Sequence, residues 1–272
     1  MKLDVKTLYL DSSAIIEIFE RTRNARQLES VLRSEGAHVL LSEETFFEIA
    51  HPGLFGKLKI QRKSTIEQLL SLPYRLVRKR GEIILRELLS LKGYVGHQTS
   101  NIFFLEQRLL LETAKHALDL KPSDFRKPNR LVSIFRERNK KINVSNAWYN
   151  EMKVINSDEQ IGGINFTELI DQPDYALLQA ALGREELSWD DFEKFVKART
   201  QYPIIEATLR AYCYLLTKLP QKNTRKDLVK DTAHLISAAQ SDLFITCDSK
   251  QYKEAQVIIP SVKAIRWKSI SS

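Results

Sequence analysis

The chain opens with two kinds of hydrophobic pattern that alternate. Short apolar runs in "KTLYLD" (residues 6–11) and "HVLLS" (residues 38–42) each end on a polar residue, and such runs predict buried strands. In residues 13–19, 26–34 and "EETFFEIAH" (residues 43–51), apolar residues recur every three or four positions, which predicts helices. The order strand, helix, strand, helix predicts a parallel sheet with helical crossovers.

Polar residues and glycines mark the expected helix ends. Ser12 or Ser13 is placed to cap the first helix, and Gly36 is expected to end the helix at residues 26–34. Near the C-terminus, Thr224 is a candidate cap for the helix predicted in "NTRKDLVKDTAHLISAAQSD" (residues 223–242).

From about residue 56 to residue 219 the spacing is helical almost throughout, although residues 139–167 fit no single pattern. Strand patterns then return in "LFITCD", "VIIP" and "VKAIRW", with a short helix expected in "SKQYKEA". We therefore expect an α/β core made of residues 1–55 and 220–272. It is interrupted at residues 56–219 by a mostly helical insertion that is a candidate for binding a substrate or a partner.

Composition narrows the class of protein. The 272 residues are 43% hydrophobic, enough for a sizeable core. Both cysteines, Cys213 and Cys247, lie in apolar runs without the spacing of metal ligands, which argues against a disulfide framework or a cysteine-rich zinc site. No apolar stretch approaches the length of a membrane span, and the first residues do not resemble a signal peptide, so we expect a soluble, cytoplasmic protein.

The net charge of +8 points to a polyanionic partner, and its distribution is uneven. Residues 1–54 hold six Lys and Arg against nine Asp and Glu, whereas residues 55–130 hold sixteen against seven. Basic side chains of the second segment could follow a phosphate backbone, or could simply form solvated helix faces. The candidates are Lys57, Lys59, Arg62, Lys63, Arg75, Arg78, Lys79 and Arg80. Nearby aromatic residues could stack on bases or pack in the core; they are Tyr74, Tyr94, Phe103 and Phe104.

Four acids occupy comparable places on this pattern. Asp11 and Asp248 each end a predicted strand, and Glu48 and Asp231 lie on predicted helices beside those strands. If the strands are neighbours, the carboxylates approach one another, raise each other's pKa and need a cation. Oxygen ligands without His or Cys favour Mg²⁺ or Mn²⁺. Asp11 and Asp248 could instead cap helices or turn the chain.

Neighbouring acids compete with two of these assignments. Glu44 lies one turn before Glu48, and Asp227 one turn before Asp231. Asp242 precedes a strand, so we expect it at the opposite edge of the sheet as a turn residue. His234 could reach the site or a phosphate, or could be packed in the core.

Together, "LYLDSSAII", "LLSEETFFEIA" and "DTAHLISAAQSDLFITCDSKQY" resemble the three sequence blocks of the PIN-domain nucleases. The resemblance implies a three-layer α/β/α sandwich and an acidic site made of Asp11, Glu48, Asp231 and Asp248. It implies one or two divalent ions that hydrolyse phosphodiester bonds, usually in RNA. Ser12, Ser42 and Thr246 match polar positions beside that site. The insertion has no counterpart in small members of the family.

Other classes of function fit the sequence less well. A haloacid dehalogenase phosphatase needs a second Asp where Ser13 stands, and the chain has no glycine-rich nucleotide loop and no Gly-x-Ser-x-Gly motif. The serious alternative is a non-catalytic nucleic-acid-binding or scaffolding protein whose acids are structural. A toxin with an antitoxin partner, a defence nuclease and an RNA-processing enzyme all remain compatible with the sequence, as does a homo-oligomer.

Overall fold

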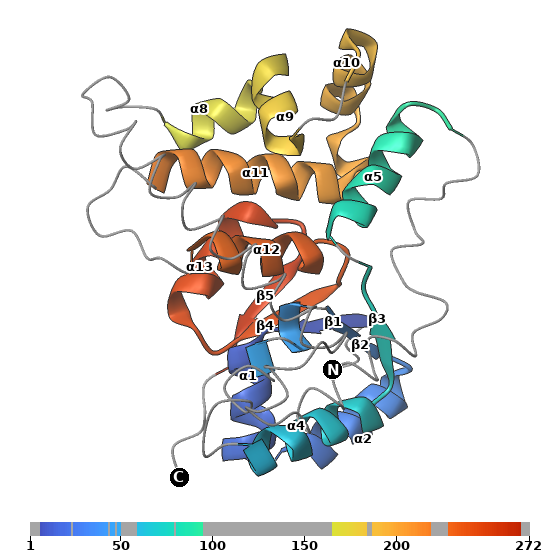
Figure 1. The fold of residues 1–272 in the computed structure, drawn as a ribbon, viewed down its shortest axis with the longest axis vertical. Helices are drawn as coiled ribbons and strands as arrows, with labels where there is room; N and C mark the ends of the chain where they lie inside the picture. The colour runs from blue at the N-terminus through green and yellow to red at the C-terminus, as the bar shows by residue number, and fades with distance from the viewer. Residues whose placement is uncertain are drawn as a thin grey trace, which may run out of the picture.

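A five-stranded parallel sheet organises the chain (Figure 1). The computed structural model describes residues 6–22, 24–42, 44–46, 48–49, 59–78, 80–94, 165–183, 187–218 and 228–267. The strand order is β3-β2-β1-β4-β5. The strands are β1 (Thr7–Leu10), β2 (His38–Leu41), β3 (Tyr74–Leu76), β4 (Leu243–Thr246) and β5 (Lys263–Arg266).

The strand order reverses direction at the centre of the sheet. From β1 the chain proceeds to β2 and β3 on one side, whereas β4 and β5 lie on the other. Leu8 pairs with Val39 of β2 and with Leu243 of β4, so β1 has a parallel neighbour on each side. Connections leave the carboxyl ends of β1 and β4 in opposite directions, and open α/β sheets bind their ligands at such a point.

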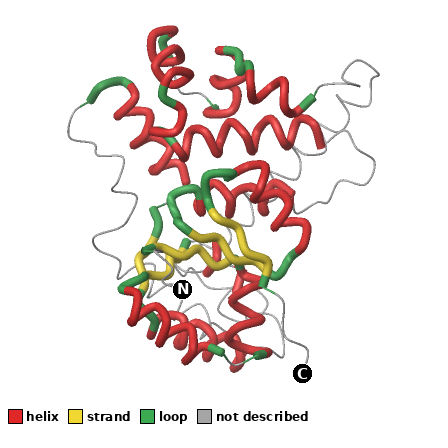
Figure 2. Tube along the Cα trace, turned by 180° about the vertical axis from the view of Figure 1, so that it is seen from behind, coloured by secondary structure: helices red, strands yellow, loops and turns green. Residues whose placement is uncertain are grey.

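Helices cover both faces of this sheet (Figures 1 and 2). On one face, Leu8 and Leu10 pack with α1 (Ser12–Ile16), the π-helical segment η1 (Glu17–Arg21), α2 (Ala25–Glu35) and α4 (Lys59–Ser71). On the other face, Tyr9 and Phe244 pack with α12 (Leu228–Ala238) and α13 (Ser249–Ile258). Strand residues alternate between the faces, so both cores are apolar. The strands and these helices form the sheet unit.

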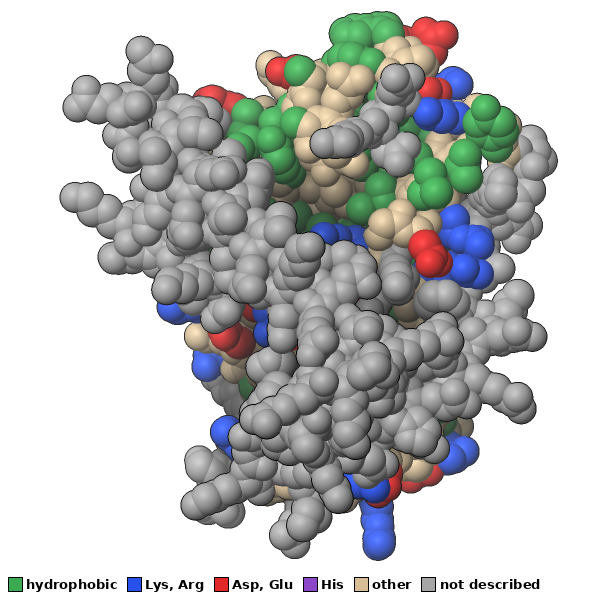
Figure 3. Space-filling view, in the orientation of Figure 1, with side chains coloured by type: hydrophobic (Ala, Val, Ile, Leu, Met, Phe, Trp, Pro, Cys, Tyr) green, Lys and Arg blue, Asp and Glu red, His purple; other side chains and the backbone are tan. Residues whose placement is uncertain are grey.

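A second group of helices lies beyond α12, and we call it the outer helical unit. It consists of α5 (Arg80–Leu91), α8 (Phe166–Asp171), α9 (Tyr175–Leu182), α10 (Trp189–Lys197), the 3₁₀ segment η3 (Arg199–Gln201) and α11 (Pro203–Lys218). Apolar side chains gather on this unit in Figure 3. Trp189 and Val196 are among its exposed apolar residues.

Helix α11 joins the two units because it is apolar on two sides. Ile204 and Ala207 belong to the core that contains Tyr9, whereas Ile205 and Leu209 belong to the core of the outer helical unit. Helix α5 does the same, with Ile83 in the first core and Leu88 in the second, so two helices are shared between the two hydrophobic cores.

The expected α/β class with a parallel central sheet is confirmed. The division into core and insertion differs from the expectation, because β3 pairs with β2 and α4 contributes Ile66 and Leu69 to the sheet core. The sheet unit therefore continues to Leu76, twenty residues past the expected boundary at residue 56. Thr224, Phe103, Phe104 and most of residues 139–167 lie outside the described residues.

Two local expectations have opposite outcomes. Gly36 ends α2 with a left-handed φ of 63°, as expected. The strand expected at "VIIP" is wrong, because α13 continues to Ile258 and buries Ala255 and Ile258 with helical spacing. Within the described residues, none of the helices combines the length and the apolar character needed to cross a membrane.

Candidate functional site

Asp11 lies directly after β1, at the point where the strand order reverses. Its Oδ1 accepts a 2.7 Å hydrogen bond from the Ala14 N–H, so Asp11 is the N-cap of α1 and the expected cap at Ser12 or Ser13 is wrong. Ser13 Oγ donates to the carboxylate at 2.9 Å, and Thr246 Oγ1 donates to Oδ2 at 2.7 Å from the end of β4. Asp11 thus links the ends of the two central strands.

The electrostatic environment of Asp11 disfavours its charge. The residue is 3% exposed, and this burial raises the pKa of the carboxyl group although the hydrogen bonds from Thr246, Ala14 and Ser13 oppose the shift. Those donors are neutral hydroxyl and amide groups. A cation next to Asp11 would favour the ionised form.

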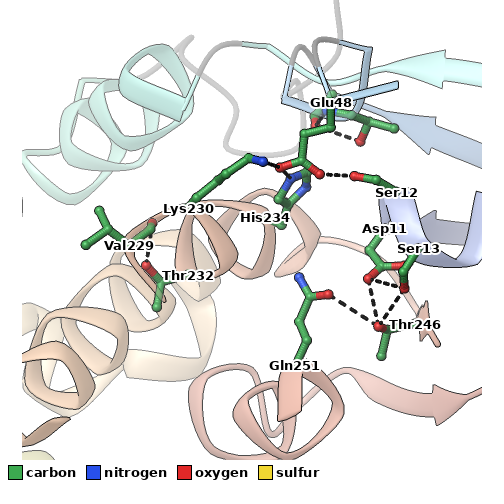
Figure 4. Close-up of polar contacts among 12 residues, drawn as sticks. Asp11, Ser12, Ser13, Glu48, Val229, Lys230, Thr232, His234, Thr246 and Gln251 are labelled. Atoms are coloured by element: carbon green, nitrogen blue, oxygen red, sulfur yellow. Dashed lines mark hydrogen bonds and ion pairs between the residues drawn. The ribbon is translucent and has the colours of Figure 1, made fainter. Parts of the chain in front are cut away.

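Glu48 follows β2 in a short helical segment and has a different environment (Figure 4). Its Oε1 lies 2.6 Å from Lys230 Nζ and 2.9 Å from His234 Nε2, and its Oε2 accepts a hydrogen bond from Ser12 Oγ. Burial alone would raise the pKa of Glu48, but His234 and Lys230 lower it to about 2. The sequence led us to expect raised pKa values for all four acids. The pKa of Glu48 is lowered instead, because its nearest partners are the cationic Lys230 and His234.

A buried chain of polar side chains extends from Glu48 towards the sheet. His234 Nδ1 lies 2.9 Å from Tyr9 Oη, and Tyr9 Oη lies 2.7 Å from Ser42 Oγ. Burial would lower the pKa of His234, but Glu48 and other carboxylates outweigh it and the net shift is upward. Ser42 therefore lies beside the site through Tyr9 and His234.

Asp248 is connected to Asp11 through one threonine. Its backbone N–H donates to Thr246 Oγ1 at 3.0 Å, and the same hydroxyl donates to Asp11. The Asp248 side chain caps α13 by accepting from the N–H groups of Lys250 and Gln251 at 2.6 and 3.2 Å. The capping role that the sequence allowed for Asp248 is therefore present in the structure.

Asp231 lies in the first turn of α12, directly after Lys230 and one turn before His234. Its competitor Asp227 lies outside the described residues. Glu44 remains a competitor of Glu48, because its charge raises the pKa of both Tyr9 and His234. Asp242 lies at the opposite edge of the sheet, where it accepts from the N–H groups of Lys6 and Thr7, as expected.

The donor chemistry around β1 and β4 suits a hard divalent ion, because carboxylate and hydroxyl oxygens predominate. The arrangement is not that of an assembled site. Across the described ranges, no three His, Cys, Asp or Glu side chains are grouped so as to hold a metal ion. Glu48 is engaged by Lys230, His234 and Ser12, and Asp248 is engaged by the start of α13.

The basic residues proposed to bind nucleic acid fall into different environments. Arg62 is buried and forms a 2.9 Å ion pair with Glu20, so its proposed contact with phosphate is wrong. Arg78 is partly buried and forms a 3.3 Å ion pair with the more exposed Glu82. The exposed candidates are Lys63, Arg75 and Arg80. Lys59 lies in α4, and Lys57 and Lys79 lie outside the described residues.

Sequence reasoning missed Lys230, Tyr9 and Ser13 as members of this site. Lys230 and His234 are four residues apart on one helix, a spacing that places both on the same face, so their shared contact with Glu48 had a sequence signal. Tyr9 looked like an ordinary strand residue. Comparison of the chain with models of protein families, with curated proteins and with solved structures finds no match.

Proposed function

We propose that this protein is a divalent-metal-dependent nuclease that hydrolyses phosphodiester bonds, with RNA as its substrate. The observation that carries the proposal is the buried Asp11 at the reversal of strand order, where hydroxyl and amide donors surround the carboxylate and burial raises its pKa. A carboxylate in these surroundings is stabilised in its ionised form by a bound cation.

In this proposal Asp11 and Asp248 are the central ligands of Mg²⁺ or Mn²⁺, and Glu48 and Asp231 complete the acidic set. The ion would supply an activated water and offset the negative charge that develops on the phosphate. The chain itself orients the ligands: Thr246 and Ser13 fix Asp11, and Ser12 fixes Glu48. The exposed Lys63, Arg75 and Arg80 would attract the nucleic acid.

The test is cleavage of labelled single-stranded RNA and DNA by the purified protein with Mn²⁺ or Mg²⁺. Cleavage should require the ion and should fall by at least about a hundredfold in Asp11→Asn and Asp248→Asn, because each removes a charged ligand. Asp190→Asn is the matched control, since it removes an exposed acid of α10. Cleavage at the wild-type rate in Asp11→Asn would exclude the proposed site.

A second candidate is a non-catalytic nucleic-acid-binding protein. It is favoured by the structural use of each acid: Asp11 and Asp248 cap helices, and Glu48 is paired with Lys230 and His234. Under this alternative the protein binds RNA in the presence of EDTA with an affinity that Asp11→Asn does not change, and RNA is not cleaved with any divalent ion.

A further inference from the structure

Lys230 places its ammonium group where it neutralises Glu48. Nζ lies 2.6 Å from Oε1, and the lysine side chain is 48% exposed whereas that of Glu48 is 15% exposed. The lysine comes from the first turns of α12, and the glutamate from the segment after β2. The ion pair therefore joins a long, partly exposed lysine side chain to a largely buried carboxylate. That carboxylate has two further protein partners.

Those partners lie on the next turn of α12, which carries His234, and at the start of α1, which carries Ser12. Buried His234 approaches the same Oε1 at 2.9 Å, and Ser12 donates to Oε2 (Figure 4). Both oxygens of Glu48 are thus engaged by the protein. The three partners differ in how easily they can leave, because only Lys230 can move its charge into solvent without breaking a buried contact.

Asp11 contrasts with Glu48 in the charge of its partners. Its donors are neutral, and burial raises its pKa. An ion that binds at Asp11 can use the second lone pair of Glu48 Oε2, but it reaches Oε1 only if Lys230 or His234 gives way.

We infer that Lys230 is a placeholder cation, which occupies Glu48 in the ion-free protein and competes with a divalent ion for that carboxylate. The inference rests on the proposed function, because it takes Glu48 as a metal ligand. Because of this competition, Lys230 raises the concentration of divalent ion that is needed to fill the site. Binding of the ion then replaces the lysine ammonium group at Glu48.

The test is direct Mn²⁺ binding to the 272-residue protein, measured by the loss of the free-ion signal in electron paramagnetic resonance. Lys230→Met should bind Mn²⁺ about tenfold more tightly than the wild type, because a competing charge is removed. Lys230→Arg should stay within about twofold of the wild type, since it keeps the charge. Lys230→Gln serves as a second neutral variant, and circular dichroism checks that each variant is folded.

Two controls separate competition at Glu48 from a general effect of charge. Lys194→Met removes a similarly exposed lysine, which is ion-paired with Asp191 on α10, and should leave Mn²⁺ affinity unchanged. In a Glu48→Gln background, Lys230→Met should change the affinity by less than about twofold, because the carboxylate for which the two cations compete is gone.

The outcomes distinguish this inference from the proposed function. If the wild type binds Mn²⁺ and Lys230→Met and Lys230→Gln do not tighten binding, the placeholder role is overturned and the nuclease proposal stands. The same conclusion follows if Lys230→Met tightens binding equally in the Glu48→Gln background. If neither the wild type nor any lysine variant binds Mn²⁺, both the proposed function and this inference fail.

Discussion

Thr246 donates a 2.7 Å hydrogen bond to Asp11 across the boundary between β4 and β1, although the two residues are 235 positions apart in the chain. The same hydroxyl accepts the N–H of Asp248. One buried side chain thus ties together both strand-end aspartates.

Thr246→Val should therefore affect stability and the candidate site together. The substitution keeps the shape of the side chain but leaves the buried Asp11 without one of its donors, which should cost about 1–3 kcal/mol of unfolding free energy. Urea denaturation measures this loss. Thr232→Val is the control, because that hydroxyl donates to the Val229 carbonyl within α12, and its cost should be below about 1 kcal/mol.

Tyr9→Phe should disconnect the polar chain behind Glu48. It removes the oxygen between His234 and Ser42, so two buried groups lose a partner and stability should fall by about 1–3 kcal/mol. Ser42→Ala should cost less in the Tyr9→Phe background than in the wild type, because the contact is already lost. Strict additivity in this double-mutant cycle would contradict the described network.

Glu87→Gln should change how stability depends on pH. Glu87 accepts from the N–H groups of Ile204 and Ile205 at the start of α11, and burial raises its pKa from 4.5 to about 7 despite these hydrogen bonds. The folded state therefore holds a proton that the unfolded state releases, so this contribution is fully present below about pH 4.5 and is lost as the pH rises through about 7.

The loss for the wild type should amount to about 3 kcal/mol, and the neutral glutamine should abolish this part of the pH dependence. Denaturation curves from pH 4 to pH 8 measure the difference between the two proteins. The exposed Glu67→Gln on α4 should retain the wild-type slope. Parallel slopes for wild type and Glu87→Gln would mean that Glu87 has the same protonation in both states.

Arg62→Met should act on stability and leave RNA affinity unchanged. The substitution leaves the buried Glu20 carboxylate without its cationic partner and with only the 2.8 Å hydrogen bond from Thr65. The free energy of unfolding should therefore fall by about 3–5 kcal/mol. Arg80→Ala, at an exposed position at the start of α5, should weaken RNA binding and leave the free energy of unfolding within about 0.5 kcal/mol. Filter binding and urea denaturation separate the two effects.

The central strands could be predicted because parallel strands buried on both faces are nearly continuous apolar runs. "LYL" and "LFIT" have this form, and both are strands of the sheet. The short edge strand β3 was missed, since three residues that follow Pro73 carry too little pattern to distinguish a strand from a loop. Its position depends on pairing with β2.

The acids of the candidate site could be located from the sequence, but their partners could not. Strand ends place Asp11 and Asp248 at the reversal of strand order, which follows from topology. Tertiary packing decides whether an acidic or a basic side chain ends up next to each acid. Lys230, for example, contacts Glu48 although the two residues are 182 positions apart. Arg62 illustrates the same limit: it shares the buried face of α4 with Ile66 and Leu69, and only the distant Glu20 explains its burial.

The continuation of the sheet past residue 56 determines what a shortened chain would be. Joining residue 55 directly to residue 220 would remove β3, α4 and α11, and would leave β2 with an open row of unpaired N–H and C=O groups at the margin of the sheet. Tyr9 and Leu40 would also lose the side chains of α11 that now pack with them. Such a fragment would be a template for edge-to-edge aggregation, so β3 and α11 protect the sheet as well as extending the protein.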